Sequence, residues 1–410
     1  LSTVTMSSGS TVTIQTNAND PAIQIDPNDP TTVYIATDLA IGEMAHTTTY
    51  TVPGTEMASA QGIEGLVIND LDYYELAPTN KHLWIATKSG AAFALNYDPT
   101  NPMSVSMASS WVYPIFAAGD GAPHRAIAID PNDKANVLIA TQNVYRNETG
   151  DGLDGAGVFD PLLVSDAGNW TEVFNPENYD DDHATSPGTT HPLFSGNVRR
   201  NYGTAIEWQT SSTGSCDRVY YTVANTDEGK QGGVFYSDDD GATWNIDTLS
   251  GSRFSSPINT LVSNDNFLWV GAGDEMGRAS LNGVYARRSL CGSSDWWKPT
   301  TSDPLFTDIQ ANHYVTAIDG AVTPSDPSYD AMVYIGSNEI NGDIYRVTLG
   351  LQANSATCTT SGFACWQFYD VTPPAIYGAV EAIAVEPFNP DHVWVAYSNC
   401  IQESVDTGRT

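Results

Sequence analysis

The sequence predicts an all-β fold, and the main observation behind this prediction is a repeated strand–turn–strand unit. Each unit is a short apolar run, a turn of Asp, Pro and Asn, and a second apolar run that ends in small residues. Clear copies span residues 25–37, 129–141 and 385–396, and weaker copies end in the runs 83–87, 219–223, 267–271 and 332–336. Two further observations agree. The 34 Gly and 23 Pro residues punctuate the chain, and no long amphipathic helical pattern is found.

The spacing of the units predicts how the strands are arranged. The seven units follow one another at intervals of roughly 40 to 80 residues, because the loops between them vary in length. A strand repeat of this length is typical of a radial propeller, in which each unit forms one four-stranded antiparallel sheet. Since the units take up the whole chain, the sequence predicts a single seven-bladed β-propeller over residues 1–410.

Each unit is expected to supply four strands, which we name A to D from the axis outward. Strand A precedes the Asp/Pro turn, strand B ends in the small residues, strand C is exemplified by residues 233–236, and strand D follows. The seventh unit stops inside its C–D turn, so we expect the alternating segment 11–16 to pair beside the strand that leads to Ser404. A ring closed in this way has no open edge. Because the sequence stops inside this turn, we also expect the chain to be part of a longer polypeptide.

The charge balance restricts the kinds of partner. The chain has 49 acidic and 16 basic residues, which gives a net charge of −33. Nucleic acid and anionic membranes are therefore poor partners, and no apolar stretch is long enough to span a bilayer. Much of the Asp content is turn chemistry, and the remainder suits a solvated surface or divalent-cation sites. The chain opens without a signal peptide, as expected of a mature or trimmed form.

The cysteines favour a protein outside the cell or at the cell surface. Cys358 and Cys365 flank a short Thr/Ser/Gly loop, which predicts a local disulfide. Cys216 and Cys291 fall on turns of adjacent units that share one face, so a second bridge between them is geometrically feasible. Cys400 is left over. Disulfides of this kind persist in oxidising compartments.

Two segments share the pattern Ser-x-Asp-x-Gly-x-Thr, at residues 237–243 and 404–410, and a shorter degenerate copy lies at residues 165–170. The Asp carboxylate can accept backbone N–H groups in a tight turn, the Gly allows a positive φ, and a following Trp packs the hairpin. The pattern resembles the Asp-box, a β-hairpin turn of several propeller families. We therefore expect a structural role for the following residues: Ser237, Asp239, Gly241, Trp244, Ser404, Asp406 and Gly408.

The resemblance implies a ligand-binding face, because the B–C and D–A loops of a propeller share one side of the ring. Acidic residues fall at matching B–C positions in five units: Asp38, Asp227, Glu228, Asp274, Glu275, Glu339 and Glu403. A ring of carboxylates can bind cations or sugar hydroxyls, and we expect a protein or glycan partner at this loop face. The competing interpretation is a solvated rim on an acidic protein.

The third unit carries the longest insertions, and they offer candidate calcium ligands. Residues 147–157 alternate oxygen-bearing side chains with glycines, although their spacing differs from that of an EF-hand loop. The candidates for Ca²⁺ are Asp151, Asp154, Asp180, Asp181 and Asp182. Nearby are His183 and His191, which could join a metal site, and the pair Arg199 and Arg200, which could clamp a carboxylate or a sulfated sugar. The alternatives are a flexible loop and a salt-bridged loop.

Three groups of proteins share the Asp-box and the propeller, and each group implies a different function for this chain. Sialidases need an arginine triad, a tyrosine nucleophile and a Phe-Arg-Ile-Pro start, and the absent tetrapeptide and only 11 Arg argue against them. Residues 34–42 are similar to the segment that carries a catalytic Asp in two-domain xyloglucan endoglucanases, which places Asp38 at that position. The Arg and second Gly of that segment are missing. The other carboxylate comes from a second propeller, and glycoside hydrolysis ordinarily needs two.

The third group is non-catalytic and consists of sortilin-like ectodomains, photosystem assembly factors and exported repeat proteins of microbial surfaces. This chain shares the repeats with that group and no further motif. The resemblance thus implies a secreted or cell-surface binding or scaffold module, or a subunit of a self-assembling extracellular layer. Half of a glycoside hydrolase is the alternative.

Overall fold

The computed structural model describes most strands of the chain together with several of their turns. The described residues are 2–5, 11–14, 23–25, 32–36, 41–45, 68–77, 80–87, 90–95, 111–112, 124–133, 136–141, 143–147, 170–176, 201–210, 217–225, 233–247, 254, 258–264, 267–273, 283–288, 296–297, 299, 304–312, 314–321, 331–337, 342–350, 365–374, 378–386, 389–397 and 400–408.

Antiparallel sheets make up almost all of the described structure. Four sheets have four strands: β6 (Ile68–Ala77), β7 (Asn80–Thr87), β8 (Gly90–Leu95) and β9 (Trp111–Val112); β10 (Ala126–Ile129), β11 (Val137–Ala140), β12 (Val144–Asn147) and β13 (Trp170–Phe174); β14 (Asn201–Thr210), β15 (Asp217–Asn225), β16 (Gly233–Ser237) and β17 (Asn245–Asp247); β21 (Val315–Ala321), β22 (Ala331–Ser337), β23 (Ile344–Gly350) and β24 (Cys365–Asp370).

Three further sheets have three described strands: β3 (Ile23–Ile25), β4 (Thr32–Ala36) and β5 (Ile41–Ala45); β18 (Ile258–Asn264), β19 (Phe267–Ala272) and β20 (Gly283–Arg288); β25 (Val380–Val385), β26 (Val393–Tyr397) and β27 (Cys400–Ser404). In each sheet the strands follow sequence order, and each pairs antiparallel with the next. The seven strands predicted as strand B of their units coincide with second strands, from β4 to β26.

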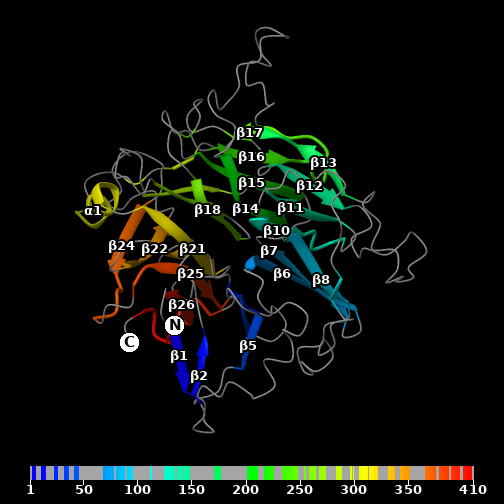
Figure 1. Ribbon diagram of the computed structural model, residues 1–410. Coiled ribbons are helices and arrows are strands. Elements are labelled where there is room, and N and C mark those ends of the chain that lie inside the picture. Colours follow the sequence, from blue (N-terminus) through cyan, green and yellow to red (C-terminus); the bar gives the residue numbers. More distant parts are fainter. Residues whose placement is uncertain are drawn as a thin grey trace, which may run out of the picture.

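The first strands of the sheets lie next to one another around the middle of the molecule. They contact in the cyclic order β3, β6, β10, β14, β18, β21, β25 and back to β3. We call these seven the inner strands. Figure 1 shows β10, β14 and β21 toward the centre, and β13, β17 and β24 at the periphery. Sheets that radiate from a ring of first strands are consistent with a β-propeller.

The small residues at the ends of the second strands make room for the neighbouring sheet. A Cβ added at Gly271 of β19 would overlap Val315 of β21, and one at Gly336 of β22 would overlap Val380 of β25. Two residues earlier, the second strands carry large aromatic side chains that are fully buried: Trp84, Tyr220, Trp269, Tyr334 and Trp394. In these five second strands a large ring is therefore followed two residues later by a smaller residue, and in β19 and β22 that residue, a Gly, admits the next inner strand.

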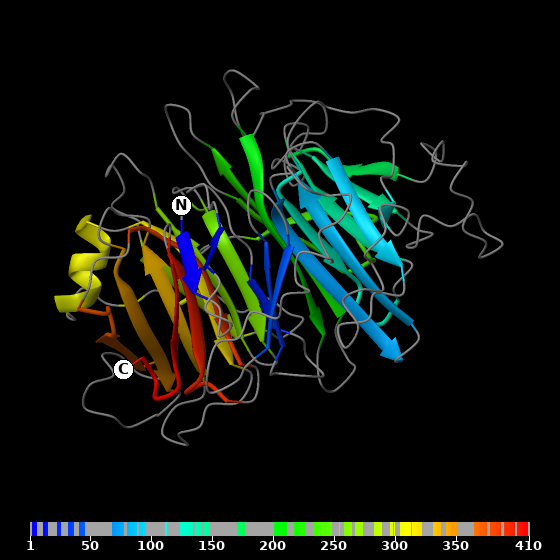
Figure 2. The same ribbon diagram turned by 60° about the horizontal axis from the view of Figure 1, so that its bottom comes forward.

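The N-terminal segment differs from the prediction. Thr11–Ile14 forms β2, which pairs with β1 (Ser2–Thr5) in a two-stranded sheet, and Thr11 lies opposite Thr5. We predicted that this segment pairs beside the strand that leads to Ser404. Among the described residues this prediction is wrong, since β2 pairs with β1 alone. Two β-branched runs separated by a short Ser/Gly stretch favour a local hairpin, which requires little loop closure. Figures 1 and 2 show this hairpin in the part of the molecule near the last sheet.

One helix was not predicted. The helix α1 (Pro304–Asn312) lies against β20 and β24 at the edge of the molecule, as Figure 1 shows. Two of its own residues, Phe306 and Ile309, lie about one turn apart and are fully buried. A Pro at the first helical position and an apolar pair at this spacing were the available signals. Among the described residues, no helix has the length and apolar character needed to cross a membrane.

Candidate functional site

Most residues of the predicted loop face lie outside the described residues. These are Asp38, Asp227, Glu228, Asp274, Glu275 and Glu339 of the acidic ring, the calcium candidates Asp151, Asp154 and Asp180 to Asp182, the neighbouring His183, His191, Arg199 and Arg200, and the cysteines Cys216, Cys291 and Cys358. Cys365 begins β24, and the thiol of Cys400 is free. Among the described residues, no group of three or more His, Cys, Asp or Glu side chains is arranged to hold a metal.

Glu403 is described, and its expected position in the B–C loop is wrong. It lies within β27 opposite Trp394, because only two residues connect β26 to β27 and the acid falls four residues into the strand. Its Oε1 atom is 2.5 Å from Nε2 of His392, and Nδ1 of the same imidazole is 2.8 Å from Oε2 of Glu386. Glu403 therefore joins the strand to the Asp/Pro-type turn at the opposite end of the sheet.

The Ser-x-Asp-x-Gly turn at residues 237–244 is held by its own side chains. The Ser237 hydroxyl donates to Oδ1 of Asp239 at 2.8 Å and accepts the Gly241 N–H at 2.8 Å. Asp239 also accepts the N–H of Thr243 at 2.7 Å and its hydroxyl at 2.6 Å. Burial alone would raise the pKa of Asp239, but these hydrogen bonds outweigh it and lower the pKa. The carboxylate points into its own turn and stabilises it.

The turn at residues 404–408 repeats this arrangement. The Ser404 hydroxyl donates to Oδ1 of Asp406 at 2.9 Å and accepts the Gly408 N–H at 2.9 Å. The glycines at the fifth position have positive φ in both turns, 85° at Gly241 and 78° at Gly408. The two segments that look alike in the sequence therefore adopt the same backbone conformation, in which Gly is favoured.

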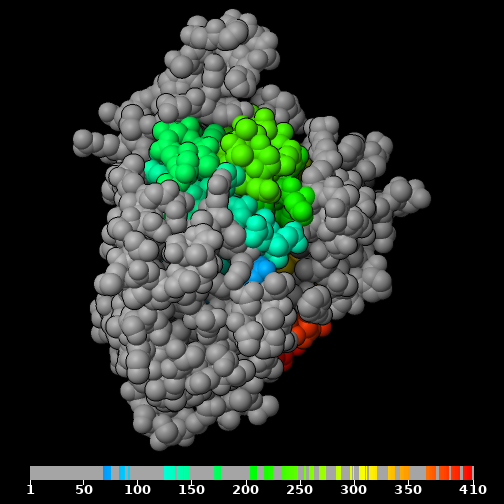
Figure 3. All heavy atoms as spheres, turned by 90° about the vertical axis from the view of Figure 1, so that its right-hand side faces the viewer, coloured from blue at the N-terminus to red at the C-terminus, as the bar shows by residue number. Residues whose placement is uncertain are grey.

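Each of these turns also packs against the sheet that precedes it. Gly241 lies against Leu138 of β11, and Gly408 lies against Val371, just after β24. The Arg146 side chain of β12 donates to the carbonyl oxygen of Asp240 at 3.2 Å. Figure 3 shows residues of the two sheets, coloured teal and green, next to one another on this side of the molecule. The turns therefore link neighbouring sheets, which is a structural role.

A second set of polar side chains links the inner strands to one another. Five of the described inner strands carry a β-bulge in their first half. In β6, β14, β18 and β21 the bulged residue donates a side-chain hydrogen bond to a main-chain carbonyl of the next inner strand or of the stretch before it. The bonds run from Asn69 to His124, from Thr204 to Ile258 at 2.7 Å, from Asn259 to Val315 at 3.0 Å and from Thr316 to Val380 at 3.1 Å. A bulge re-aims the side chain along the ring rather than across the sheet.

Three inner-strand carboxylates complete these links. An inner strand is the edge strand of its sheet, so the N–H groups on its unpaired side need hydrogen-bond acceptors from outside the sheet. The acceptors are Oδ2 atoms: Asp70 accepts Ile127 N–H at 2.9 Å, Asp72 accepts Ile129 N–H at 2.7 Å and Asp319 accepts Val385 N–H at 2.7 Å. The other oxygen of each carboxylate accepts the N–H of the following residue. Side-chain bonds thus link β6 to β10, β14 to β18, β18 to β21 and β21 to β25.

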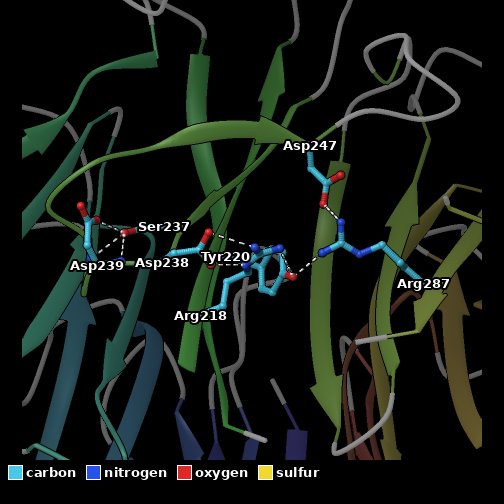
Figure 4. A network of polar contacts seen from close by, with 8 residues as sticks. Arg218, Tyr220, Ser237, Asp238, Asp239, Asp247 and Arg287 are labelled. Carbon is cyan, nitrogen blue, oxygen red and sulfur yellow. Dashed lines mark hydrogen bonds and ion pairs between the residues drawn. The ribbon is translucent and has the colours of Figure 1, made fainter. Parts of the chain in front are cut away.

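Two buried arginines meet at Tyr220, and one of them, Arg287, bridges the β14–β17 and β18–β20 sheets, as Figure 4 shows. Arg218 binds Asp238 through Nε at 2.6 Å and Nη2 at 3.0 Å. Arg287, from β20, forms an ion pair with Asp247 and donates to the hydroxyl of Tyr220. Both guanidinium groups also lie over the Tyr220 ring. Because the Arg287–Asp247 pair is desolvated and joins the two sheets, we assign the network to cohesion between sheets.

Comparisons with known proteins agree with this architecture. No protein-family model and no curated protein sequence matches the chain. A GH74 xyloglucanase from Xanthomonas campestris has a similar structure, with a TM-score of 0.56 and 12% identity over 97% of this chain and 53% of that one. An ancestral GH74 enzyme gives a TM-score of 0.54 and 12% identity over 94% of this chain and 45% of that one.

Semaphorin 2a from Drosophila gives a TM-score of 0.50 and 9% identity over 96% of this chain and 74% of that one. At such low identity these likenesses show the fold alone. Together with the radiating sheets, they indicate a β-propeller fold. The chain spans about half the length of the two GH74 enzymes that it matches.

Proposed function

We propose that this chain is a non-catalytic binding or scaffold module of a secreted or cell-surface protein, built as one ring of seven sheets. The supporting observation is the set of side-chain bonds between successive inner strands. The carboxylates of Asp70, Asp72 and Asp319 are used to hold backbone N–H groups of neighbouring strands. A ring fixed in this way is a rigid support for variable loops, which is how many binding proteins present a partner surface.

The loop face remains the proposed site for a protein or glycan partner, and the acidic ring that includes Asp38 remains its proposed chemistry. Self-assembly of several copies through this face is part of the same proposal. The bridges Cys358–Cys365 and Cys216–Cys291 would suit an extracellular location.

The alternative function is glycoside hydrolysis, in which Asp38 would be one of two carboxylates. A single carboxylate does not supply both the acid and the base or nucleophile of this reaction. We therefore expect no release of reducing sugar when the isolated chain is incubated with xyloglucan and a panel of other β-glucans. The measurement compares the wild-type chain with Asp38→Ala, and uses an active xyloglucanase as the positive control.

Turnover that is present in the wild type and lost in Asp38→Ala would replace the binding module with the hydrolase. Equal background release from both proteins supports the proposal. Retardation of the wild-type protein in a native gel that contains xyloglucan, without cleavage, would identify a glycan as the partner.

Calcium binding is the second test of the loop residues. If the Asp151/Asp154 loop and the run Asp180 to Asp182 hold Ca²⁺, the ion stabilises the folded state by mass action. We expect the melting temperature to rise in millimolar Ca²⁺ and to fall when chelator is added. Mg²⁺ at the same concentration controls for ionic strength, which also screens an acidic protein. A melting temperature indifferent to chelator would remove calcium from the proposal.

A further inference from the structure

The turn between β25 and β26 carries a histidine whose two ring nitrogens each contact a carboxylate. Nδ1 of His392 is 2.8 Å from Oε2 of Glu386, at the start of the same turn, and Nε2 is 2.5 Å from Oε1 of Glu403 in β27. The His392 side chain is only 5% exposed. Its ring also lies against the indole of Trp394, with ring centroids 3.8 Å apart. The imidazole is therefore enclosed by two acids and an aromatic ring. We call Glu386, His392 and Glu403 the histidine clamp.

The contacts in the histidine clamp restrict the number of protons that it holds. A neutral imidazole has an N–H on one nitrogen and a lone pair on the other, and an ionised carboxylate only accepts hydrogen bonds. With a neutral ring and two ionised acids, one contact would bring a lone pair against a carboxylate oxygen. Two hydrogen bonds therefore require a second proton. An imidazolium supplies it, because it has a donor at each nitrogen.

The corresponding turn between β10 and β11 shows that the backbone conformation does not require a histidine. In that turn the N–H of Asp130 donates to the carbonyl of Asn136 at 2.9 Å, and in the β25–β26 turn the N–H of Glu386 donates to the carbonyl of His392 at 3.0 Å. The two further main-chain bonds inside each turn also correspond. Asn136 therefore occupies the position of His392, and the histidine side chain is a special feature of the last sheet.

We propose that His392 is a doubly protonated clamp that fastens the β25–β26 turn to β27, and that this fastening is released when the ring loses a proton. The imidazolium donates from Nδ1 to Glu386 and from Nε2 to Glu403. Loss of one proton leaves a single donor, so one bond is lost and a ring lone pair faces a carboxylate. The inner strand of this sheet, β25, contacts β3 of the first sheet, so the clamp is in the sheet where the ring closes.

The surroundings of the clamp favour the positive charge. The strands β3, β21, β22 and β27 contact β25 or β26, and the turn at residues 404–408 bonds to the β25–β26 turn through Thr407. On these strands and turns the described charged groups other than His392 are all acidic: Asp319, Glu381, Glu386, Asp391, Glu403 and Asp406. The other titratable groups there are the phenols of Tyr334 and Tyr397 and the thiol of Cys400. Nearby negative charge stabilises the protonated form of a histidine.

The direction of the pH effect follows from the proton count. In the unfolded chain an ordinary histidine loses its second proton at a pH of about 6.5. Above that pH the folded clamp holds one proton more than the unfolded chain, so the free energy of unfolding decreases as the pH rises. The stabilisation by the clamp is therefore complete at mildly acidic pH and is lost at alkaline pH, where the ring deprotonates in the folded chain as well.

Denaturant unfolding of the wild type and of His392→Asn, measured from mildly acidic to alkaline pH, tests the clamp. The variant places in this turn the residue that the β10–β11 turn already has, so the turn should keep its backbone. We expect the wild-type midpoint to fall more steeply with pH than that of the variant. The ratio of the two unfolding constants should change by at most about tenfold per pH unit, as for one proton. Parallel pH dependences would overturn the proposal.

Nitrogen NMR of the His392 ring in the wild-type protein tests the protonation without relying on the fold of a variant. Both ring nitrogens should carry a proton at neutral pH, and a single protonated nitrogen would contradict the proposal. In Glu403→Gln the ring should lose its second proton at lower pH than in the wild type. The control is Glu381→Gln, which removes an acid from the other end of β25 and should cause a smaller change. Equal changes in the two variants would show that Glu403 does not hold the ring.

Discussion

Replacing Trp244 by Ala is expected to destabilise the protein by about 3 to 5 kcal/mol, the range for removing a large aromatic side chain from a core. Trp244 is buried, and it stacks on Phe174 with ring centroids 5.4 Å apart and meets Tyr221 edge-on at 6.1 Å. Its indole N–H donates to the carbonyl of Gly241 at 2.9 Å, which ties the ring to the turn. Thermal or denaturant unfolding measures the loss.

Trp244→Phe is the matched control, because it keeps an aromatic ring and removes the indole hydrogen bond. It should cost less than the alanine variant, with about 1 kcal/mol attributable to the bond. If Trp244→Ala changed stability little, the turn would not hold the two sheets together. Loss of partner binding in Asp239→Asn at unchanged stability would show that the turn is a ligand site instead.

The second large effect is expected at Arg287. Arg287→Met removes the positive charge that pairs with buried Asp247 and the donor that reaches Tyr220. Breaking a buried ion pair by removing one partner costs about 3 to 5 kcal/mol, because the other charge stays buried and unpaired. The unfolding free energy of the variant, compared with that of wild type, gives this loss.

Arg218→Met is the control in the same network. Its partner Asp238 has half of its side chain exposed, 50%, against 9% for Asp247. Water can therefore solvate Asp238 once the arginine is gone, and the loss should be smaller. Adding Asp247→Asn to Arg287→Met should restore part of the stability. Equal losses at the two arginines, or no recovery in the double variant, would contradict a desolvated pair at Arg287.

The repeated parts of the fold could be predicted from the sequence. Second strands such as β11 and β26 follow an Asp/Pro or Glu/Pro turn and read as apolar runs, since they are covered on both faces. The two Ser-x-Asp-x-Gly segments also adopt the expected turn, because every hydrogen bond in it is local.

The links between inner strands could not be predicted in the same way. Asn69, Asp72 and Asp319 bond to strands more than 50 residues away, so no local pattern indicates their partners. Alignment of the units on their turns does not bring Asp72 and Asp319 to one position either, because β6 continues to Ala77 and β21 only to Ala321. Glu403 was misplaced because the length of the β26–β27 connection decides which end of the sheet it reaches.

The central claim is that side chains lock the inner strands into a rigid ring, and amide hydrogen exchange tests it most directly. The N–H groups of Ile127, Ile129 and Val385 are bonded to aspartates of the neighbouring inner strand. At a constant pH, these three amides should exchange as slowly as amides inside a sheet. Exchange as fast as that of amides open to solvent would contradict the ring and the binding module built on it.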